Sequence, residues 1–190
     1  MIPQLYKCFE HWAAQGTVWI YSDPHFADPE AANYNRIPDE EQVKLINSKV
    51  GRKDTLIILG DIGSIEWAKK LRGYKVLICG NHDAGATNYE EVFNEIYTGP
   101  LFIAEKILLS HEPVYGLPWC LNIHGHDHNN VEPYKEGCKH INLAANVCGY
   151  TPINLGKIIK EGILADIPSI HRVTIDRAVE EKRGKLSGIL

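Results

Sequence analysis

The sequence predicts an α/β protein whose mainly parallel first sheet is packed against a second, strand-rich half. Two observations lead to this fold class. Up to residue 99, apolar strand-like runs alternate with helix-like segments, and such alternation is typical of a parallel sheet. From residue 101 onward, short strand-like runs follow one another with little room for helices between them. The second half therefore supplies strands for a second sheet.

Each element of the first half has its own signal. Helix 39–50 begins at Asp39, with Gln42 three residues later as in a capping box, and its apolar residues form a helix-like face: Val43, Leu45, Ile46 and Val50. Continuous apolar runs bounded by glycine or polar residues predict strands over 17–21, 55–59 and 75–79. Two further helices are expected over 64–71 and 88–97.

The second half is divided by turn residues into short segments. Strands are expected over 101–104, 106–110, 121–124 and 140–143. A helix over 157–164 and a strand over 172–175 complete the prediction. Because the chain has no repeat, linker or low-complexity tract, we treat 1–190 as one domain, with 156–190 as a C-terminal extension of unassigned role.

Composition excludes several classes of protein. The chain has 190 residues, 44% hydrophobic and 23% charged, with a formal net charge of −4, as in ordinary soluble domains and unlike a surface that coats nucleic acid. The sequence has no recognisable signal peptide and no apolar run of roughly 18 residues that would cross a bilayer. Five cysteines without C-x-x-C spacing indicate reduced thiols. We expect a cytoplasmic protein without a membrane partner, and the sequence gives no signal for its oligomeric state.

Polar side chains follow five predicted strands directly, at the point where each strand ends. These residues are Asp23, His25, Asp61, Asn81, His111, His126 and His128. Ligands of open α/β sheets collect beyond the carboxyl ends of the strands. Taken singly, D-x-H, Gly-Asp and a lone His are weak evidence, since Gly-Asp is also a common turn. The run 80–83 and the pair His126 and His128 are stronger signals. The five motifs in this order, each at a strand end, predict one site.

The residue types indicate metal chemistry. Seven nitrogen and oxygen donors without a cysteine suit Mn, Fe or Zn, and the set is too rich in imidazole for Ca or Mg. Seven ligands are too many for one ion, but they suit two ions about 3.5–4 Å apart that share a carboxylate. We therefore predict two divalent metal ions, with Mn first and Fe, Zn or Ni as alternatives.

The motifs D-x-H, G-D, G-N-H-D, a lone His and G-H-x-H occur in that order between Asp23 and His128. This arrangement resembles the calcineurin-like metallophosphoesterase superfamily, and most closely its small bacterial and phage members that lack a cap domain. The resemblance implies a four-layer α/β/β/α sandwich of two mixed sheets. It assigns one metal to Asp23, His25, Asp61 and His128. The other metal would take Asp61, Asn81, His111 and His126, with Asp23 reaching both ions as an alternative.

The resemblance also implies hydrolysis of a phosphate ester. A water shared by two metals loses a proton near neutral pH and would attack phosphorus. We expect His82 to protonate the leaving group and Asp83 to orient its ring. The substrate would be a small phosphomonoester or phosphodiester, nucleotide-like esters included. Candidate substrate contacts are Arg36, Tyr115 and Trp119, which are also explained as an ordinary exposed arginine and as core aromatics.

Two alternatives remain beside a small-molecule phosphoesterase. A nuclease would need a groove for a long strand, against which the acidic balance and the lack of Lys/Arg clusters speak. A protein-binding scaffold of the same fold would have lost catalytic residues, whereas all seven ligand positions and His82 are present. For His124, at the end of a predicted strand, both a packing role and a supporting role behind the ligands are open.

Overall fold

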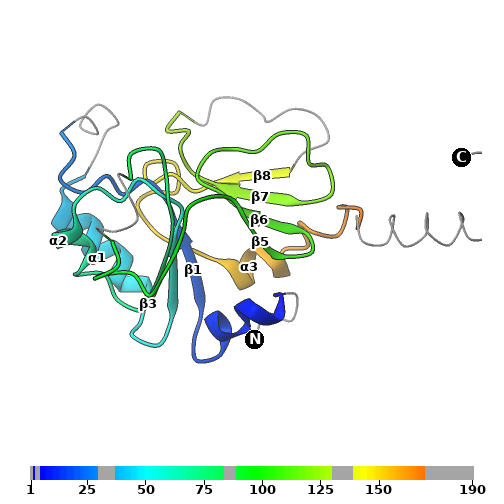
Figure 1. The fold of residues 1–190 in the computed structure, drawn as a ribbon, viewed down its shortest axis with the longest axis horizontal. Coiled ribbons are helices and arrows are strands. Elements are labelled where there is room, and N and C mark those ends of the chain that lie inside the picture. The colour runs from blue at the N-terminus through cyan, green and yellow to red at the C-terminus, as the bar shows by residue number, and fades with distance from the viewer. Residues whose placement is uncertain (1, 3–4, 30–36, 84–88, 130–138, 170–190) are drawn as a thin grey trace, which may run out of the picture.

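A computed structural model describes residues 2, 5–29, 37–83, 89–129 and 139–169, and these form two mixed sheets (Figure 1). The first has the strand order β4-β3-β2-β1-β9, with β1 to β4 parallel and β9 antiparallel to β1. Its strands are β1 (Val18–Tyr21), β2 (Thr55–Ile58), β3 (Tyr74–Ile78), β4 (Glu95–Tyr97) and β9 (Ile153–Asn154). The predicted α/β class with two sheets is confirmed.

The second sheet has the order β5-β6-β7-β8, in which β6, β7 and β8 are parallel and β5 runs antiparallel to β6. Its strands are β5 (Leu101–Ala104), β6 (Ile107–Leu109), β7 (Leu121–His124) and β8 (Lys139–Asn142). The helical segments are the 3-10 helix η1 (Lys7–Ala13), α1 (Asp39–Lys49), α2 (Ile65–Ala68) and α3 (Leu155–Lys160). Helices α1 and α2 lie on the side of the first sheet that faces away from the second (Figure 1).

Two apolar clusters hold these layers together. Ile57 belongs to a cluster shared with strands of the second sheet, whereas Leu56 and Ile58 belong to the cluster that contains α1. Strand β2 is therefore buried on both faces, which explains why it is apolar throughout instead of alternating. Residues of η1 and α3 complete the cluster between the sheets.

The helix predicted over 88–97 is wrong. Turns occupy residues 89–92, and β4 begins at Glu95. Apolar residues at Tyr89, Val92 and Phe93 imitate a helical face, but they reach the α1 cluster from turns. Asn94, just before β4, joins the chain to β3 at this point. Its amide donates to the Lys75 carbonyl, and its side chain accepts from the Lys75 amide.

For the other helices, the predicted and observed boundaries differ by only a few residues. Helix α2 covers only part of the predicted 64–71, and α3 begins two residues before the predicted 157. The 3-10 helix η1 was not predicted; Trp12 anchors it by donating to Glu95, 2.8 Å away in β4. The predicted strand 172–175 lies outside the described residues. Within the described parts of the chain, no helix is both long and apolar enough to cross a membrane.

The outward face of the second sheet is covered, in the described residues, by the loop that follows β6. Asn122 and His124 alternate with the inward-facing residues of β7, yet both are buried. The loop backbone donates from Val114 to the Asn122 side chain at 2.8 Å. His124 packs its ring against His140 and lies 2.8 Å from the Gly125 carbonyl through Nδ1. These contacts give His124 a packing position at the strand end.

His124 should make stability depend on pH. Burial lowers its pKa from 6.5 to about 4, so between these values the unfolded chain binds a proton that the folded chain does not. Stability is therefore full above pH 6.5 and falls as the pH drops toward 4. Replacing His124 with Asn should reduce the loss of unfolding free energy between pH 7 and pH 4.5 by about 2 kcal/mol. Urea unfolding in chelator measures this, and equal losses in both proteins would contradict it.

Candidate metal centre

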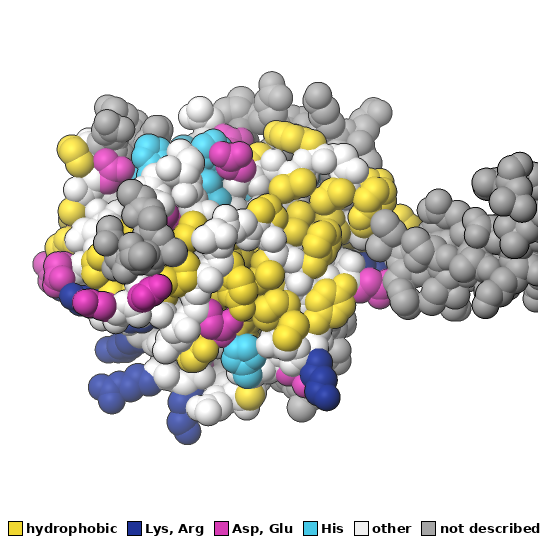
Figure 2. Space-filling view, in the orientation of Figure 1, with side chains coloured by type: hydrophobic (Ala, Val, Ile, Leu, Met, Phe, Trp, Pro, Cys, Tyr) yellow, Lys and Arg dark blue, Asp and Glu magenta, His cyan; other side chains and the backbone are white. Residues whose placement is uncertain are grey.

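All the predicted metal ligands follow strand ends on one side of the two sheets. Asp23 and His25 follow β1, Asp61 follows β2, and Asn81 follows β3 in the first sheet. The remaining ligands, His111, His126 and His128, follow β6 and β7 of the second sheet. Histidine side chains reach the surface at this end of the molecule, in the upper part of Figure 2. The carboxyl ends of parallel strands from two sheets thus converge, as the order of motifs predicted.

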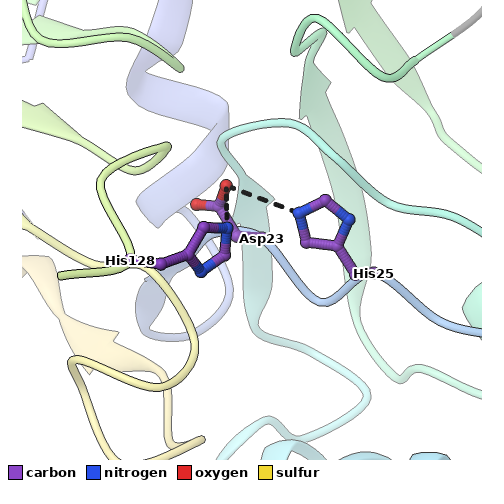
Figure 3. A group of neighbouring side chains, drawn as sticks. All are labelled: Asp23, His25 and His128. Atoms are coloured by element: carbon purple, nitrogen blue, oxygen red, sulfur yellow. Dashed lines mark ion pairs between the residues drawn. The ribbon is translucent and has the colours of Figure 1, made fainter. Parts of the chain in front are cut away.

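The first group of ligands is Asp23, His25 and His128 (Figure 3). Oδ1 of Asp23 lies 3.8 Å from Nε2 of His128 and 4.0 Å from Nε2 of His25. All three side chains are largely buried. One carboxylate oxygen and two imidazole nitrogens that point toward one another at these distances can hold one metal ion.

The second group is Asp61, His111 and His126, and Asn81 joins it. Oδ1 of Asn81 lies 2.7 Å from Nε2 of His111 and 3.1 Å from Nδ1 of His126. Those two ring nitrogens are 3.1 Å apart. Four nitrogen and oxygen donors therefore face a common point, and this group too can hold a metal ion.

Asp61 connects the two groups. Its Oδ2 atom lies 3.4 Å from Nε2 of His111 in the second group and 3.5 Å from Nε2 of His25 in the first. A carboxylate in this position can serve both groups. Asp23 belongs to the first group, because the His111 nitrogen nearest to it, Nδ1 at 4.0 Å, is directed to the Leu59 carbonyl at 2.7 Å.

The three best-buried imidazoles among the predicted ligands are oriented by contacts behind the site. Nδ1 of His111 donates to the Leu59 carbonyl, and Nδ1 of His25 lies 2.8 Å from the Asp28 carboxylate. Nδ1 of His128 lies 3.1 Å from Oδ1 of Asn146. A hydrogen bond at Nδ1 directs Nε2 toward the metal position, as in many metal sites. Sequence reasoning missed Asp28 and Asn146; Asp28, three residues beyond His25, follows a motif closely enough to have been noticed.

The donor set fits cations, because it is electrostatically incomplete without them. Oδ1 of Asp23 is buried and accepts no hydrogen bond within the described residues. Burial raises the pKa of this carboxyl, which His111 opposes. In addition, a neutral His111 that donates from Nδ1 presents a lone pair at Nε2 to the Asn81 oxygen 2.7 Å away. Two acceptors this close repel unless a proton or a metal ion lies between them.

Strained backbone accompanies the ligands. Asp23, His25, Asp61 and His126 adopt φ values of 55°, 44°, 53° and 65°, in the left-handed region that costs non-glycine residues on the order of 1–3 kcal/mol each. Four of seven predicted ligands share this conformation, which other contacts must stabilise. Asp83 supplies some of them: its carboxylate accepts from the backbone amides of Asp61, Ile62 and Gly80 at 2.7–2.9 Å.

These contacts correct the role predicted for Asp83. We expected its carboxylate to orient the His82 ring, but the hydrogen bonds above direct it to the loop backbone. His82 itself is exposed, and its amide donates to Oδ1 of Asp61 at 2.9 Å. Its ring centroid lies 5.5 Å from that of His25. His82 therefore stands beside the metal groups, and Asp83 braces the loop that carries it.

The substrate contacts predicted from sequence are less well placed. Arg36 lies outside the described residues. Tyr115 is 54% exposed, with its ring 5.7 Å from that of His140, on the loop over the outward face of the second sheet. Trp119 is partly buried near the end of the same loop. The described contacts of Tyr115 thus join it to the second sheet and not to the two metal groups.

Gly125 should be essential for metal affinity, because its backbone packs against the Asp23 carboxylate. A Cβ at this position would overlap with the side chains of Ser22 and Asp23. The substitution Gly125→Ala is expected to displace Asp23 and to weaken metal binding about 10–100-fold. Gly99→Ala is the control, since a Cβ there has no neighbour within 4 Å. Calorimetric Mn²⁺ titration of both variants checks this, and wild-type affinity in Gly125→Ala would contradict it.

Comparison with known proteins finds relatives without an assigned function. No family model matches the sequence. The crystal structure of AQ665, a protein of unknown function from Aquifex aeolicus, aligns with a TM-score of 0.65 at 28% identity, over 76% of this chain and 98% of that one. The uncharacterized protein MJ1445 of Methanocaldococcus jannaschii is 32% identical over 168 residues, which cover 75% of this chain and 89% of the relative. At that identity and coverage, the chain belongs to the same family as MJ1445.

Proposed function

We propose that this protein is a metal-dependent phosphoesterase of the calcineurin-like type that hydrolyses a small phosphate ester. The observation that carries the proposal is the convergence of all seven predicted ligands into two adjoining groups, with Oδ2 of Asp61 within 3.5 Å of a histidine of each. Two-metal hydrolases need such a carboxylate between their ions. Under this proposal, the two mixed sheets are the inner layers of a four-layer sandwich.

The ligands divide as the motifs suggest. Asp23, His25 and His128 would hold one ion, and Asn81, His111 and His126 the other, with Asp61 between them. When bound, two such ions lower the pKa of a shared water to about 7 and neutralise charge on the phosphoryl oxygens. Mn is the first candidate and Fe, Zn or Ni are the alternatives, because the set combines the carboxylate and amide oxygens that suit Mn with the imidazoles that suit Fe, Ni and Zn.

Among the described residues beside the two ligand groups, His82 is our candidate for moving a proton. Its ring stands beside His25, is exposed to an incoming substrate, and belongs to neither ligand group. We assign it the protonation of the leaving oxygen. Its loop is held from both ends, because its amide donates to Asp61 while Asp83 accepts from Gly80, Asp61 and Ile62. This bracing holds the backbone from which the ring projects beside the two ligand groups.

The test compares chelator-stripped protein with and without Mn²⁺ on bis-p-nitrophenyl phosphate and p-nitrophenyl phosphate. We expect turnover that depends on the metal, and the ratio of the two rates indicates whether diesters or monoesters are preferred. His82→Ala should keep its metals yet lose roughly 10²–10⁴-fold in kcat. His11→Ala, at an exposed histidine of η1, is the control. Absence of turnover with Mn²⁺, Fe²⁺, Zn²⁺ and Ni²⁺ would contradict the proposal and favour a binding scaffold.

A further inference from the structure

A pocket of about 270 Å³ adjoins the second ligand group, with Asn81 and His111 in its wall. Three chain segments surround it: the end of β3, the β4–β5 connection and the loop after β6. These segments come from both sheets, so the pocket lies where the sheets meet beside the metal centre. A molecule whose phosphate lies between the two ligand groups can extend into it.

The loop that forms one wall is fixed from beneath. Ser110 donates from Oγ to the Glu112 carbonyl at 2.6 Å, and the buried Asn122 donates to that Ser110 oxygen at 2.8 Å. The other end of the Asn122 side chain accepts from the Val114 amide at 2.8 Å. Because Ser110 and Asn122 are each 1% exposed, these bonds are shielded from water. The wall is therefore preorganised and does not have to be built by a ligand.

The residues that line the pocket and its volume favour small groups without a negative charge. Among the described lining residues, Pro100, Pro113 and Val114 are apolar, Thr98 offers a hydroxyl, and Glu112 bears the one charge. No lysine or arginine is among them, so beyond the metal ion proposed at Asn81 and His111, whose charge the reacting phosphate would neutralise, a second phosphate or a carboxylate would meet the negative charge of Glu112. The volume lies below the roughly 300–1,000 Å³ of drug-sized pockets. It suits a single small unit, not a stretch of polymer.

We propose that this pocket receives the leaving group and that the substrate is the phosphate ester of a single small, uncharged alcohol. This rests on the proposed phosphoesterase activity. Water supplies the oxygen that bonds to phosphorus, the bond from phosphorus to the ester oxygen breaks, and the alcohol leaves with one proton of that water. Esters of anionic alcohols, polyphosphates and long nucleic acid strands are disfavoured by Glu112 and by the pocket's size.

The test uses two leaving groups that differ by one charge. Phenyl phosphate and 3-carboxyphenyl phosphate, or their methyl diesters if the enzyme prefers diesters, are compared in the Mn²⁺-loaded protein. The wild type should favour the phenyl ester at least tenfold in kcat/KM. Glu112→Lys should remove or reverse this preference, whereas Val114→Trp, which fills the pocket, should raise KM for both esters. An unchanged preference in Glu112→Lys, together with unchanged KM in Val114→Trp, would overturn the proposal.

A second readout separates the pocket from the chemistry. Phenol and 3-hydroxybenzoate, the two leaving groups themselves, are titrated into ¹⁵N-labelled metal-free protein and followed by NMR. Phenol should shift the amides of Thr98 and Val114, and 3-hydroxybenzoate should do so at least tenfold more weakly. If neither ester is hydrolysed but phenol shifts these amides, the phosphoesterase proposal fails while the pocket's selectivity stands. If phenol shifts neither amide, the pocket proposal fails even where turnover is found.

Discussion

Asp61→Asn is expected to remove at least one metal ion and to lower turnover on the order of 10³-fold, since metal stabilisation of the transition state supplies several kcal/mol. Asp61 is the carboxylate whose Oδ2 lies within 3.5 Å of both groups, at His25 and His111. Asparagine keeps the size of the side chain and tolerates its φ of 53°. The substitution therefore removes one negative charge while it leaves the loop's shape intact.

Metal content and kcat are measured together to check this. Asp166→Asn makes the same chemical change at a carboxylate that is 87% exposed and paired only loosely, 3.5 Å from Lys139, and should behave as the wild type. An Asp61→Asn protein that kept two ions and turned over within tenfold of the wild type would show that Asp61 does not bridge.

Asp23→Asn should have effects of opposite sign in the absence and presence of metal. Without metal, Asp23 is a buried carboxyl whose pKa is raised by burial and whose Oδ1 accepts no hydrogen bond within the described residues. Asparagine removes the charge, and its oxygen can still accept from the His126 amide, as Oδ2 of Asp23 does at 2.9 Å. We expect the metal-free variant to be about 1–3 kcal/mol more stable than the wild type.

With metal, the order should reverse. An ion that binds only the folded protein stabilises it by about 4.1 kcal/mol at one thousand times its dissociation constant. The variant loses this gain, which is larger than its expected advantage without metal. Thermal unfolding of both proteins in chelator and in Mn²⁺ measures the difference. If the variant were less stable in chelator and gained as much from Mn²⁺ as the wild type, Asp23 would be a structural residue and not a ligand.

The sequence correctly predicted the elements whose pattern of apolar residues matches the faces that are buried in the structure. The run Thr55–Ile58 is apolar because β2 is buried on both faces, and α1 shows Val43 and Ile46 on one face because that face meets the sheet. The helix predicted over residues 88–97 is wrong because its apolar pattern and its packing disagree. The apolar spacing of these residues suits a helix, but pairing of β4 with β3, from Glu95 onward, overrides local spacing.

The candidate site likewise has a part that the sequence predicts and a part that it does not. Ligand types and their places at strand ends can be found from motifs, because parallel topology brings those ends together. Apart from the contact of Asp28 with His25, the contacts behind the ligands cannot be found in this way, because they join residues distant in the chain. Asn146 reaches His128 across 18 residues, and the Leu59 carbonyl reaches His111 across 52. Asp83 shows the limit within a motif, since its neighbour in sequence is His82 but two of its three backbone partners, Asp61 and Ile62, belong to another loop.

The most direct test of the two-metal claim is the number of ions that one chain binds as activity appears. Chelator-stripped protein is titrated with Mn²⁺, and bound metal, by mass spectrometry after gel filtration, is compared with hydrolysis of bis-p-nitrophenyl phosphate at each point. The account predicts two ions per chain, with turnover rising as the second is bound. A chain that binds no Mn²⁺, Fe²⁺, Zn²⁺ or Ni²⁺, or that binds two ions and hydrolyses neither nitrophenyl ester, would contradict it.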